Sequence, residues 1–196
     1  MKKKWEVLSK DAGFKGFFTL NRYRLRHELY QGGWSQTIER EVLERGHAAA
    51  VIPYDPVLKS TLLIEQFRPG AMANDTGPWL KEYIAGIVEP GENGDEVVRR
   101  EAFEEAGLTL SDVNYISTYY PSPGGSSETI ALYWAQTDLS QAGGVYGLAT
   151  EGEDILATVY PFSDVLAMLD DGTINNSLTM LLTLWLQRHL ASHGGE

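Results

Sequence analysis

Residues 86–108 read GIVEPGENGDEVVRREAFEEAGL, in which a glycine-rich bend runs directly into what reads as a short acidic helix. Asn93 can cap the first turn of that helix, while Glu96, three residues later, reaches back in a capping box. Gly107 supplies the left-handed residue that commonly ends a helix. The pattern therefore predicts a helix of about three and a half turns over residues 94–106.

Three glutamates lie on one side of the predicted helix. At 100° per residue, Glu101 and Glu105 fall about 40° apart, and Glu104 lies about 60° to the other side of Glu101. The neighbouring stripe, which should face a sheet, is apolar and consists of Val98, Ala102 and Ala106. The carboxylates are therefore expected at the edge of the buried face.

Two interpretations of this acidic patch are open from the residues alone. In the first, it is a charged surface in which Arg100 pairs with Glu104 or Glu96 at helical spacing. In the second, it binds a divalent cation such as Mg²⁺, which would offset the repulsion between carboxylates partly removed from water. The bend over residues 86–94 would let the backbone approach the same patch.

The composition of the 196-residue chain limits the classes of function. A formal net charge of −11 argues against broad contact with nucleic acid, whose phosphates need a basic surface. The chain has no cysteine, which excludes disulfides and thiolate sites, so a metal must bind oxygen or imidazole. The basic start, MKKKWEVLSKDAGFKG, is not followed by an apolar run of signal-peptide length, and no stretch could span a bilayer. These features predict a cytoplasmic protein without a membrane partner.

The amino-terminal part reads as a small antiparallel sheet. Residues 14–45 hold the short β-like runs FKGFFTL, YRLRHELY and SQTIEREVLE, with turn signals at Asn21 and at Gly32–Gly33. This predicts an amino-terminal β-sheet segment over residues 1–46.

From His47 onward the apolar runs are longer and predict the main core. The expected strands are AAAVIPY, STLLIEQF, KEYIAGIVE, YISTYY, TIALYWAQ and ILATVY. Helices are expected over residues 94–106, over 163–170 opening at Ser163, and over 175–192. The mixture predicts an α/β fold, a sandwich with a mixed sheet, for a domain over residues 47–196.

The charged and glycine residues of the opening stretch resemble the Nudix box in their spacing. Gly86 is followed after five residues by Glu92 and after seven more by Arg100-Glu101, and Glu104-Glu105 and Gly107-Leu108 complete the pattern. Ala102 stands where the family usually has a larger aliphatic residue. The resemblance implies the Nudix fold, an α/β/α sandwich with a mixed sheet. It also implies hydrolysis, with Mg²⁺ or Mn²⁺, of a nucleoside diphosphate linked to another group.

Segments outside the box are similar to the ADP-ribose pyrophosphatase subgroup of that family. They are RYRLRHELY, EREVLERGHAAAVIPYDP, LLIEQFRPG, SPGGSSE and GLATEGEDI, and Pro123 follows Leu108 by fifteen residues, where the subgroup carries a distinguishing proline. The resemblance covers nearly the whole chain. It implies hydrolysis of ADP-ribose to AMP and ribose 5-phosphate by a homodimer with exchanged amino-terminal segments. Two alternatives stay open: a pyrophosphatase for another nucleotide sugar, such as a GDP-sugar, and a catalytically silent ADP-ribose-binding regulator.

The resemblance also implies a metal site and a catalytic base. The residues that match the family's metal ligands are Ala85, through its carbonyl, Glu101 and Glu105, with Glu104 as a helper. In the turn-rich segment GLATEGEDI, Glu151 aligns with the base and Glu153 with a ligand of an additional metal ion. By composition alone, that segment reads as an acidic surface loop and Ala85 as an ordinary strand residue.

Further positions resemble substrate-binding residues of the subgroup. Arg68 ends the strand LLIEQF and resembles the arginine that contacts the diphosphate. Phe17 and Arg40 resemble the pair that stacks on adenine from the other subunit, and Phe18 could exchange roles with Phe17. The residues that resemble the loop around the terminal ribose are Ser122, Gly125 and Glu128. Without the resemblance, these positions would read as surface arginines, a core phenylalanine and a plain turn.

Overall fold

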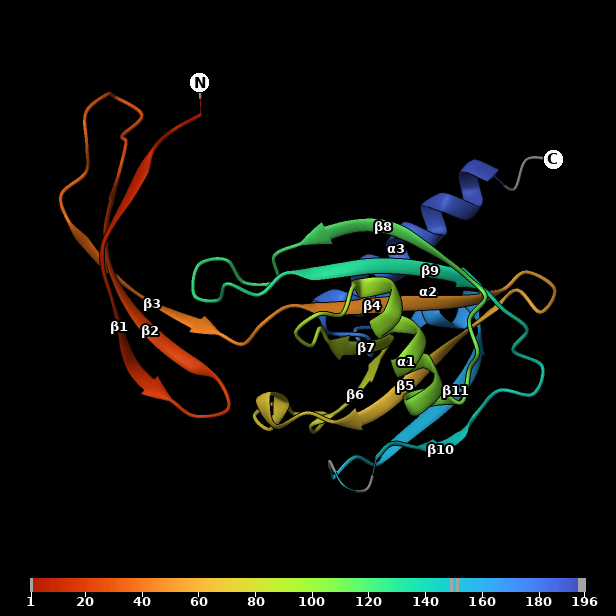
Figure 1. Cartoon of the computed structure of the whole chain (residues 1–196). Coiled ribbons are helices and arrows are strands. Elements are labelled where there is room, and N and C mark those ends of the chain that lie inside the picture. The colour runs from red at the N-terminus through yellow and green to blue at the C-terminus, as the bar shows by residue number, and fades with distance from the viewer. Residues whose placement is uncertain (1, 149, 151, 194–196) are drawn as a thin grey trace. The chain divides into compact units, whose positions relative to one another are not determined.

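The computed structural model describes residues 2–148, 150 and 152–193 and divides into two compact units (Figure 1). Unit 1 comprises Met1–His47 and Tyr120–Thr129, and unit 2 comprises Ala48–Tyr119 and Ile130–Glu196. The amino-terminal residues thus form one unit with a loop from a distant part of the chain.

Unit 1 is a three-stranded antiparallel sheet with that loop attached to one edge. Its strands are β1 (Trp5–Lys15), β2 (Thr19–His27) and β3 (Ile38–Glu44), in the order β1-β2-β3. Leu43 N–H donates to Gly125 O at 2.8 Å, and Leu43 O accepts from Ser127 N–H at 3.2 Å. Backbone hydrogen bonds therefore fix residues 120–129 to β3.

The predicted amino-terminal sheet is confirmed, but its first predicted turn is wrong. Asn21 lies within β2, where it is buried and pairs with Val42 of β3. The chain instead reverses at Gly16, whose N–H donates to Phe18 O at 2.9 Å. Asparagine favours turns, and nothing local in the sequence shows that neighbouring strands cover this one. The first strand is also longer than predicted, because β1 begins at Trp5.

Unit 2 is built on an eight-stranded mixed sheet. Its strands are β4 (Ala48–Asp55), β5 (Ser60–Phe67), β6 (Trp79–Glu82), β7 (Ile84–Ile87), β8 (Asp112–Tyr119), β9 (Ile130–Gln136), β10 (Gly144–Tyr146) and β11 (Ile155–Pro161). The main path runs β10-β11-β5-β4-β9-β8, with β6 paired to β5 and β7 paired to β4. Strands β4 and β9 are parallel, whereas β4 and β7 are antiparallel. The short strand before the glycine-rich bend therefore lies beside the central strand β4.

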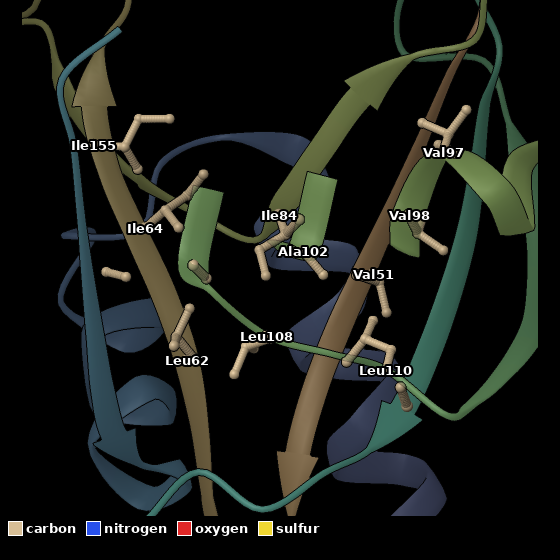
Figure 2. Packing of buried hydrophobic residues seen from close by; sticks show 14 of the residues in the cluster. Val51, Leu62, Ile64, Ile84, Val97, Val98, Ala102, Leu108, Leu110 and Ile155 are labelled. Atoms are coloured by element: carbon tan, nitrogen blue, oxygen red, sulfur yellow. The ribbon is translucent and has the colours of Figure 1, made fainter. Parts of the chain in front are cut away.

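Helices cover both faces of this sheet, which confirms the predicted α/β/α sandwich. They are α1 (Gly94–Ala106), α2 (Phe162–Asp170) and α3 (Ser177–His193), and a short 3₁₀ turn, η1, spans Pro69–Ala71. Along β4, Ala49 and Val51 pack in the cluster that contains α1, whereas Ala50 and Ile52 pack in the cluster that contains α2 and α3. Figure 2 shows the α1 side, with Ala102 of the helix close to the strands. Alternate residues of one strand thus build two core layers.

Most predicted elements of unit 2 are present, with small differences. The strand predicted over residues 81–89 is divided at Tyr83, because the chain changes its partner strand there from β5 to β4. Strand β10 was not predicted, since three residues are too few to show alternation. Helix α2 begins at Phe162 rather than Ser163, and α3 spans 177–193 rather than 175–192. Throughout the described ranges, no helix is both long and apolar enough to cross a membrane.

Candidate active site

Helix α1 is fixed at both ends, as its sequence predicts. Asn93 Oδ1 accepts hydrogen bonds from the N–H groups of Asp95 and Glu96 at 3.0 and 3.1 Å, and Glu96 Oε2 accepts from Asn93 N–H at 3.0 Å. Gly107 has a left-handed φ of 65°, and its N–H donates to Phe103 O at 3.0 Å. Both predicted caps are therefore confirmed. They fix where the helix begins and ends, and so where its glutamates lie.

Glu101 and Glu105 lie where α1 meets β7. Ala85 N–H donates to Glu105 Oε2 at 3.2 Å, and only 3% of Glu105 is exposed. A Cβ added to Gly86 would lie 1.8 Å from Glu101 Oε1, so only glycine leaves room for this carboxylate. The fold thus brings Ala85, Glu101 and Glu105 together.

Burial raises the pKa of both carboxyl groups. The pKa of Glu101 is raised to about 7, chiefly by desolvation, although the charge of Arg100 opposes the shift. The pKa of Glu105 is raised well above its usual 4.5, first by burial and then by the charge of Glu101. A bound cation would stabilise two neighbouring carboxylates that are costly to ionise.

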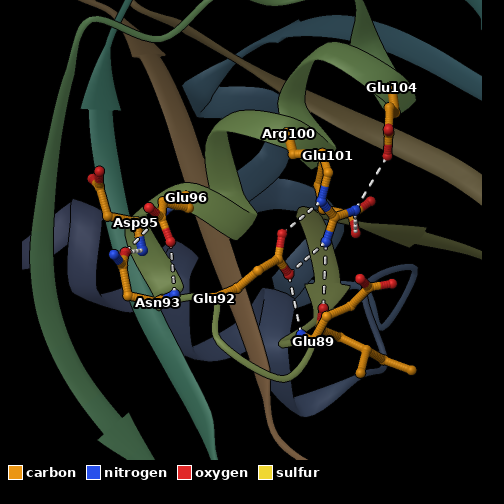
Figure 3. Close-up of polar contacts among 9 residues, drawn as sticks. Glu89, Glu92, Asn93, Asp95, Glu96, Arg100, Glu101 and Glu104 are labelled. Atoms are coloured by element: carbon orange, nitrogen blue, oxygen red, sulfur yellow. Dashed lines mark hydrogen bonds and ion pairs between the residues drawn. The ribbon is translucent and has the colours of Figure 1, made fainter.

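Arg100 is the arginine of α1 that contacts the acidic patch (Figure 3). Its Nε and Nη2 each donate to Glu92 at 3.2 Å, and its Nη1 lies 2.8 Å from Glu101 Oε1 and 3.3 Å from Glu104 Oε2. Of the two pairings expected for Arg100, the one with Glu104 is present, while Glu96 serves in the helix cap. Arg100 therefore joins the bend to the acidic face of the helix.

The donor set at this place fits a hard divalent cation. Mg²⁺ and Mn²⁺ bind carboxylate and carbonyl oxygens together with water, and Glu101, Glu105 and the Ala85 carbonyl are donors of that kind. Among the described residues, no group of three or more Asp, Glu or His side chains is arranged to hold a metal ion by itself. Further ligands would therefore come from the backbone, from water or from a bound phosphate.

Arg68 shares the electrostatic environment of these carboxylates. It directly follows β5 and forms an ion pair with Glu82, with Nη2 at 2.7 Å and Nε at 2.9 Å from Glu82 Oε2. Its charge partly counteracts the raised pKa of Glu105. The position expected to contact a diphosphate thus lies near the expected metal ligands.

The loop between β10 and β11 is attached to α1. Gly147 N–H donates to Glu104 O at 3.3 Å, and Glu153 Oε2 accepts from Leu148 N–H at 3.1 Å. The charge of Glu153 also contributes to the raised pKa values of Glu101 and Glu105, so Glu153 belongs to the same cluster of charges. The expected base, Glu151, lies outside the described residues.

The expected adenine-binding residues lie in unit 1. Phe17 lies in the turn between β1 and β2 and is 88% exposed. Arg40 lies in β3, and its Nη1 donates to Glu39 O at 2.7 Å. The neighbouring Phe18 lies under a different guanidinium, that of Arg45, at 5.2 Å from the ring centroid.

The expected ribose-binding loop also belongs to unit 1. Ser122 O accepts hydrogen bonds from the N–H groups of Gly125 and Ser126 at 3.1 and 2.9 Å, which closes a tight turn. Glu128 is buried, and its Oε1 lies 3.4 Å from Arg45 Nε. The expected metal-binding and substrate-binding residues, Arg68 excepted, therefore fall in different units.

Two surface hollows of unit 2 do not contain the expected site residues. One, of about 660 Å³, is lined by the turn after β4 and the segment after β9, including Asp55 and Asp138. The other, of about 330 Å³, is lined by the end of α1, by that same segment and by Tyr146. The acidic site is therefore recognised by the charge and burial of its carboxylates and not by a deep surface hollow.

Comparison with known protein families matches residues 44–177 to the NUDIX domain. The chain belongs to the NUDIX domain family. The match includes the whole stretch 86–108, so the family inferred from the box is confirmed and the chain is a NUDIX hydrolase. Dependence on a divalent metal is a general property of such enzymes, and the carboxylates of α1 are suited to it.

This NUDIX chain has similar relatives over most of its length. An ADP-ribose pyrophosphatase of Escherichia coli (strain K12) is 40% identical over 184 residues, which cover 94% of this chain and 88% of the relative. A GDP-mannose pyrophosphatase of Escherichia coli O1:K1 / APEC is 35% identical over 150 residues, which cover 76% of this chain and 78% of the relative. A solved structure, "Crystal structure of ADP compounds hydrolase", has a TM-score of 0.72 at 19% identity and covers 97% of this chain and 96% of its own. At that identity the structure supports the fold alone.

Two carboxylates that bind residues of the expected site segments were not identified from the sequence. Glu82 binds Arg68, and Glu44 accepts hydrogen bonds from Ser127 and Tyr23. A signal for Glu82 exists in the sequence. Glu82 lies in the next strand after the one that ends before Arg68, and an arginine at a strand end favours a nearby carboxylate. Glu44 has no local signal, since Ser127 lies 83 residues away in the chain.

Proposed function

We propose that this NUDIX hydrolase is an Mg²⁺-dependent ADP-ribose pyrophosphatase. The observation that carries the proposal is 40% identity, over 94% of this chain, to a relative that bears that name. The meeting of Glu101, Glu105 and Ala85 where α1 packs on β7 supports it, since these donors suit a hard cation. Mg²⁺ is the proposed metal because it is bound through a few carboxylates, water and substrate phosphate, and Mn²⁺ is the alternative.

The proposed reaction breaks the diphosphate of ADP-ribose on the adenosyl side. A water oxygen forms a bond to the adenosyl phosphorus, and the bond from that phosphorus to the bridging oxygen breaks. The bridging oxygen leaves with ribose 5-phosphate, the water gives up a proton, and AMP is the second product. A divalent metal, when bound, supplies acidification of water and neutralisation of phosphate charge.

Each expected residue has a task in this reaction. Arg68 would bind diphosphate oxygens with its forked donors. Glu101, Glu105 and the Ala85 carbonyl would hold the metal, with Glu153 as a ligand of an additional ion. The residues that would bind the rest of the substrate are Phe17 and Arg40 at the adenine and Ser122, Gly125 and Glu128 at the terminal ribose.

Glu151 is the proposed general base, and its removal gives a direct test. Base assistance is worth about two to four orders of magnitude, so Glu151→Gln should lower kcat by about that much with little change in KM. Hydrolysis in ¹⁸O-labelled water should place the label in AMP. Label in ribose 5-phosphate, or an unimpaired Glu151→Gln enzyme, would contradict the assignment and make Glu153 the next residue to test.

A substrate panel tests the function as a whole. The panel should contain ADP-ribose, GDP-mannose, NADH and a dinucleoside polyphosphate, each with Mg²⁺ or Mn²⁺, and the products should be identified by mass spectrometry. We expect the highest kcat/KM for ADP-ribose. A preference for GDP-mannose would favour the second function, which the 35% identical relative supports. Tight binding of ADP-ribose without turnover would instead indicate a regulator.

We also propose that the enzyme is a homodimer in which Phe17 and Arg40 complete the partner's site. The exposed aromatic side chains of unit 1, such as Trp5 and Phe14, support this because burial in a dimer would remove them from water. The cytoplasmic location stays a prediction, and cell fractionation would test it.

A further inference from the structure

Glu82 is a buried carboxylate next to the arginine proposed to bind the diphosphate. It ends β6, is 8% exposed, and pairs with Ile64 in the antiparallel register of β5 with β6. Its Oε2 accepts from Arg68 Nη2 at 2.7 Å, from Arg68 Nε at 2.9 Å and from Gln66 Nε2 at 3.4 Å. One carboxylate oxygen thus fixes two neighbouring side chains.

This group lies on the side of the sheet that carries the acidic helix. Ile64 belongs to the core cluster that contains α1, and Gln66 and Arg68 follow it at intervals of two residues. The charge of Arg68 acts on Glu105 of that helix. Glu82 therefore orients Arg68 on the same face as the expected metal ligands.

Fixing the guanidinium has two consequences for phosphate binding. An arginine that already has the required orientation loses less conformational entropy when it binds a ligand. The ion pair uses Nε and one Nη2 donor of the five N–H donors of the guanidinium, so the others are available to phosphate oxygens. Without Glu82, the positive charge would be drawn toward the carboxylates of α1 instead.

We infer that Glu82 is a positioning residue that holds Arg68 in the orientation in which it binds the substrate diphosphate. The inference rests on the proposed function, because that function makes Arg68 the diphosphate ligand. A purely structural ion pair is the competing explanation. The chain offers a matched example of one: Glu65 of β5 and Lys81 of β6 pair at 2.8 Å, and alternation turns both side chains to the other face of the same two strands.

The test compares Glu82→Gln with Glu65→Gln in the full-length protein with Mg²⁺. For Glu82→Gln we expect kcat/KM for ADP-ribose to fall about 10- to 100-fold, as for other misplaced catalytic groups. The Kd of the non-hydrolysable analogue α,β-methylene ADP-ribose should rise in parallel. Glu65→Gln should stay within about twofold of the parent in both measurements, since its ion pair lies on the face of the sheet away from the expected metal ligands.

A double-mutant cycle with Arg68→Ala separates positioning from structural support. If Glu82 acts through Arg68, the variant Arg68→Ala/Glu82→Gln should be no slower than Arg68→Ala alone. Independent losses that multiply in the double variant would overturn the inference. Equal losses in Glu65→Gln and Glu82→Gln would overturn it as well, as would an unimpaired Glu82→Gln enzyme.

Two further measurements keep the outcome interpretable. If Glu82→Gln does not fold, Glu82→Asp carries the test, because it keeps the charge, moves the carboxylate by one methylene group and should raise the Kd of the analogue. If the parent does not cleave ADP-ribose, the proposed function fails, and the same variants are then compared on the nucleotide sugar that the substrate panel identifies. If the parent cleaves ADP-ribose and Glu82→Gln cleaves it equally well, the inference about Glu82 fails alone.

Discussion

The two units of the molecule differ in what holds them together. Unit 2 buries apolar side chains on both faces of its sheet, from Val51 and Leu62 on one side to Ile52 and Leu63 on the other. Among the described residues of unit 1, the buried side chains are those of Asn21 and Glu128, and both are polar. The large aromatic side chains that unit 1 leaves exposed are Trp5, Phe14, Phe17, Tyr30, Trp34 and Tyr120.

Polar contacts take the place of a core in unit 1. Glu44 accepts from Tyr23 Oη and from Ser127 Oγ, each at 2.5 Å, and Lys10 Nζ lies 3.4 Å away. This network joins all three strands to the loop over residues 120–129. Directed hydrogen bonds can fix a small sheet, but they bury little apolar surface, and small units usually need a partner for stability. Unit 2 thus has an apolar core of its own, whereas the described residues of unit 1 are held together mainly by hydrogen bonds.

The change with the strongest predicted effect is the loss of a carboxylate at Glu101 or Glu105 in unit 2. Glu105→Gln and Glu101→Gln should each lower kcat by several orders of magnitude, because loss of one metal-bound charge raises the barrier by several kcal/mol. The fold should remain intact, as circular dichroism would show, since glutamine has nearly the same volume. Asp95→Asn is the matched control on the same helix, where Asp95 pairs with Arg99. Near-native turnover of both glutamine variants at saturating Mg²⁺ would contradict the proposal that this helix holds the metal ion.

The proposed exchange of unit 1 between subunits can be tested by mixing two impaired proteins. Arg40→Ala removes the proposed adenine contact in unit 1, and Glu105→Gln removes a proposed metal ligand in unit 2. If each site combines unit 2 of one subunit with unit 1 of the other, random exchange restores about a quarter of the sites, since one site of each hybrid escapes both changes. Activity should be measured after the two proteins have been mixed and allowed to exchange. A mixture that stays inactive, or a parent that is fully active as a monomer in sedimentation, would contradict the exchange.

The same chemical change in the two units should have different effects on stability. Leu62→Ala removes a fully buried side chain of unit 2 and should lower the free energy of unfolding by about 2–5 kcal/mol. Leu8→Ala changes a half-exposed side chain of β1 and should cost no more than about 0.5 kcal/mol in the monomer. Urea unfolding measures both effects. If the dimer buries β1, the effect of Leu8→Ala should also depend on protein concentration, and equal effects of the two variants at all concentrations would contradict the comparison.

The sequence predicts unit 2 better than unit 1, and the reason is the range of the contacts. The caps of α1, its apolar stripe and the grouping of Glu101 with Glu105 all depend on residues within one short stretch, so local rules suffice. The buried position of Asn21 and the bond of Glu44 to Ser127 depend on strands and loops far away in the chain. No local pattern could have shown either.

The candidate site divides in the same way. The box specifies its glutamates locally, and the approach of Ala85 follows from the short connection between β7 and α1. The pairing of Glu82 with Arg68 depends on the register in which β6 pairs with β5, and this register could not be predicted from the sequence. The expected segments for adenine and ribose could be located only through the resemblance, because a turn phenylalanine and a glycine-rich loop have no distinctive chemistry of their own.

The smallest expected effect concerns the polar network of unit 1 and its dependence on pH. The hydroxyl of Ser127, followed by that of Tyr23, lowers the pKa of Glu44 from 4.5 to about 2. Because the folded pKa lies below the unfolded one, the ionised carboxylate stabilises the fold above about pH 4.5, and this contribution is lost as the pH falls toward 2. Glu44→Gln lacks it at every pH. The variant should therefore be less stable than the parent by about 1–2 kcal/mol at pH 7, as for a lost hydrogen bond to a charged group.

The shape of the pH curve distinguishes this network from a general effect of charge. The difference in unfolding free energy between the parent and Glu44→Gln should be constant from about pH 7 to 5 and should shrink between about pH 4.5 and 2. Hydrogen exchange at the amide of Ser127 would show whether the loop loosens in the same range. Glu41→Gln, an exposed change on the same strand, should follow the parent throughout. A difference that persists undiminished at pH 2, or an equal effect of Glu41→Gln, would mean that the carboxylate of Glu44 does not hold the loop to the sheet. The backbone hydrogen bonds of Leu43 with Gly125 and Ser127 would then hold the loop to β3 without that carboxylate.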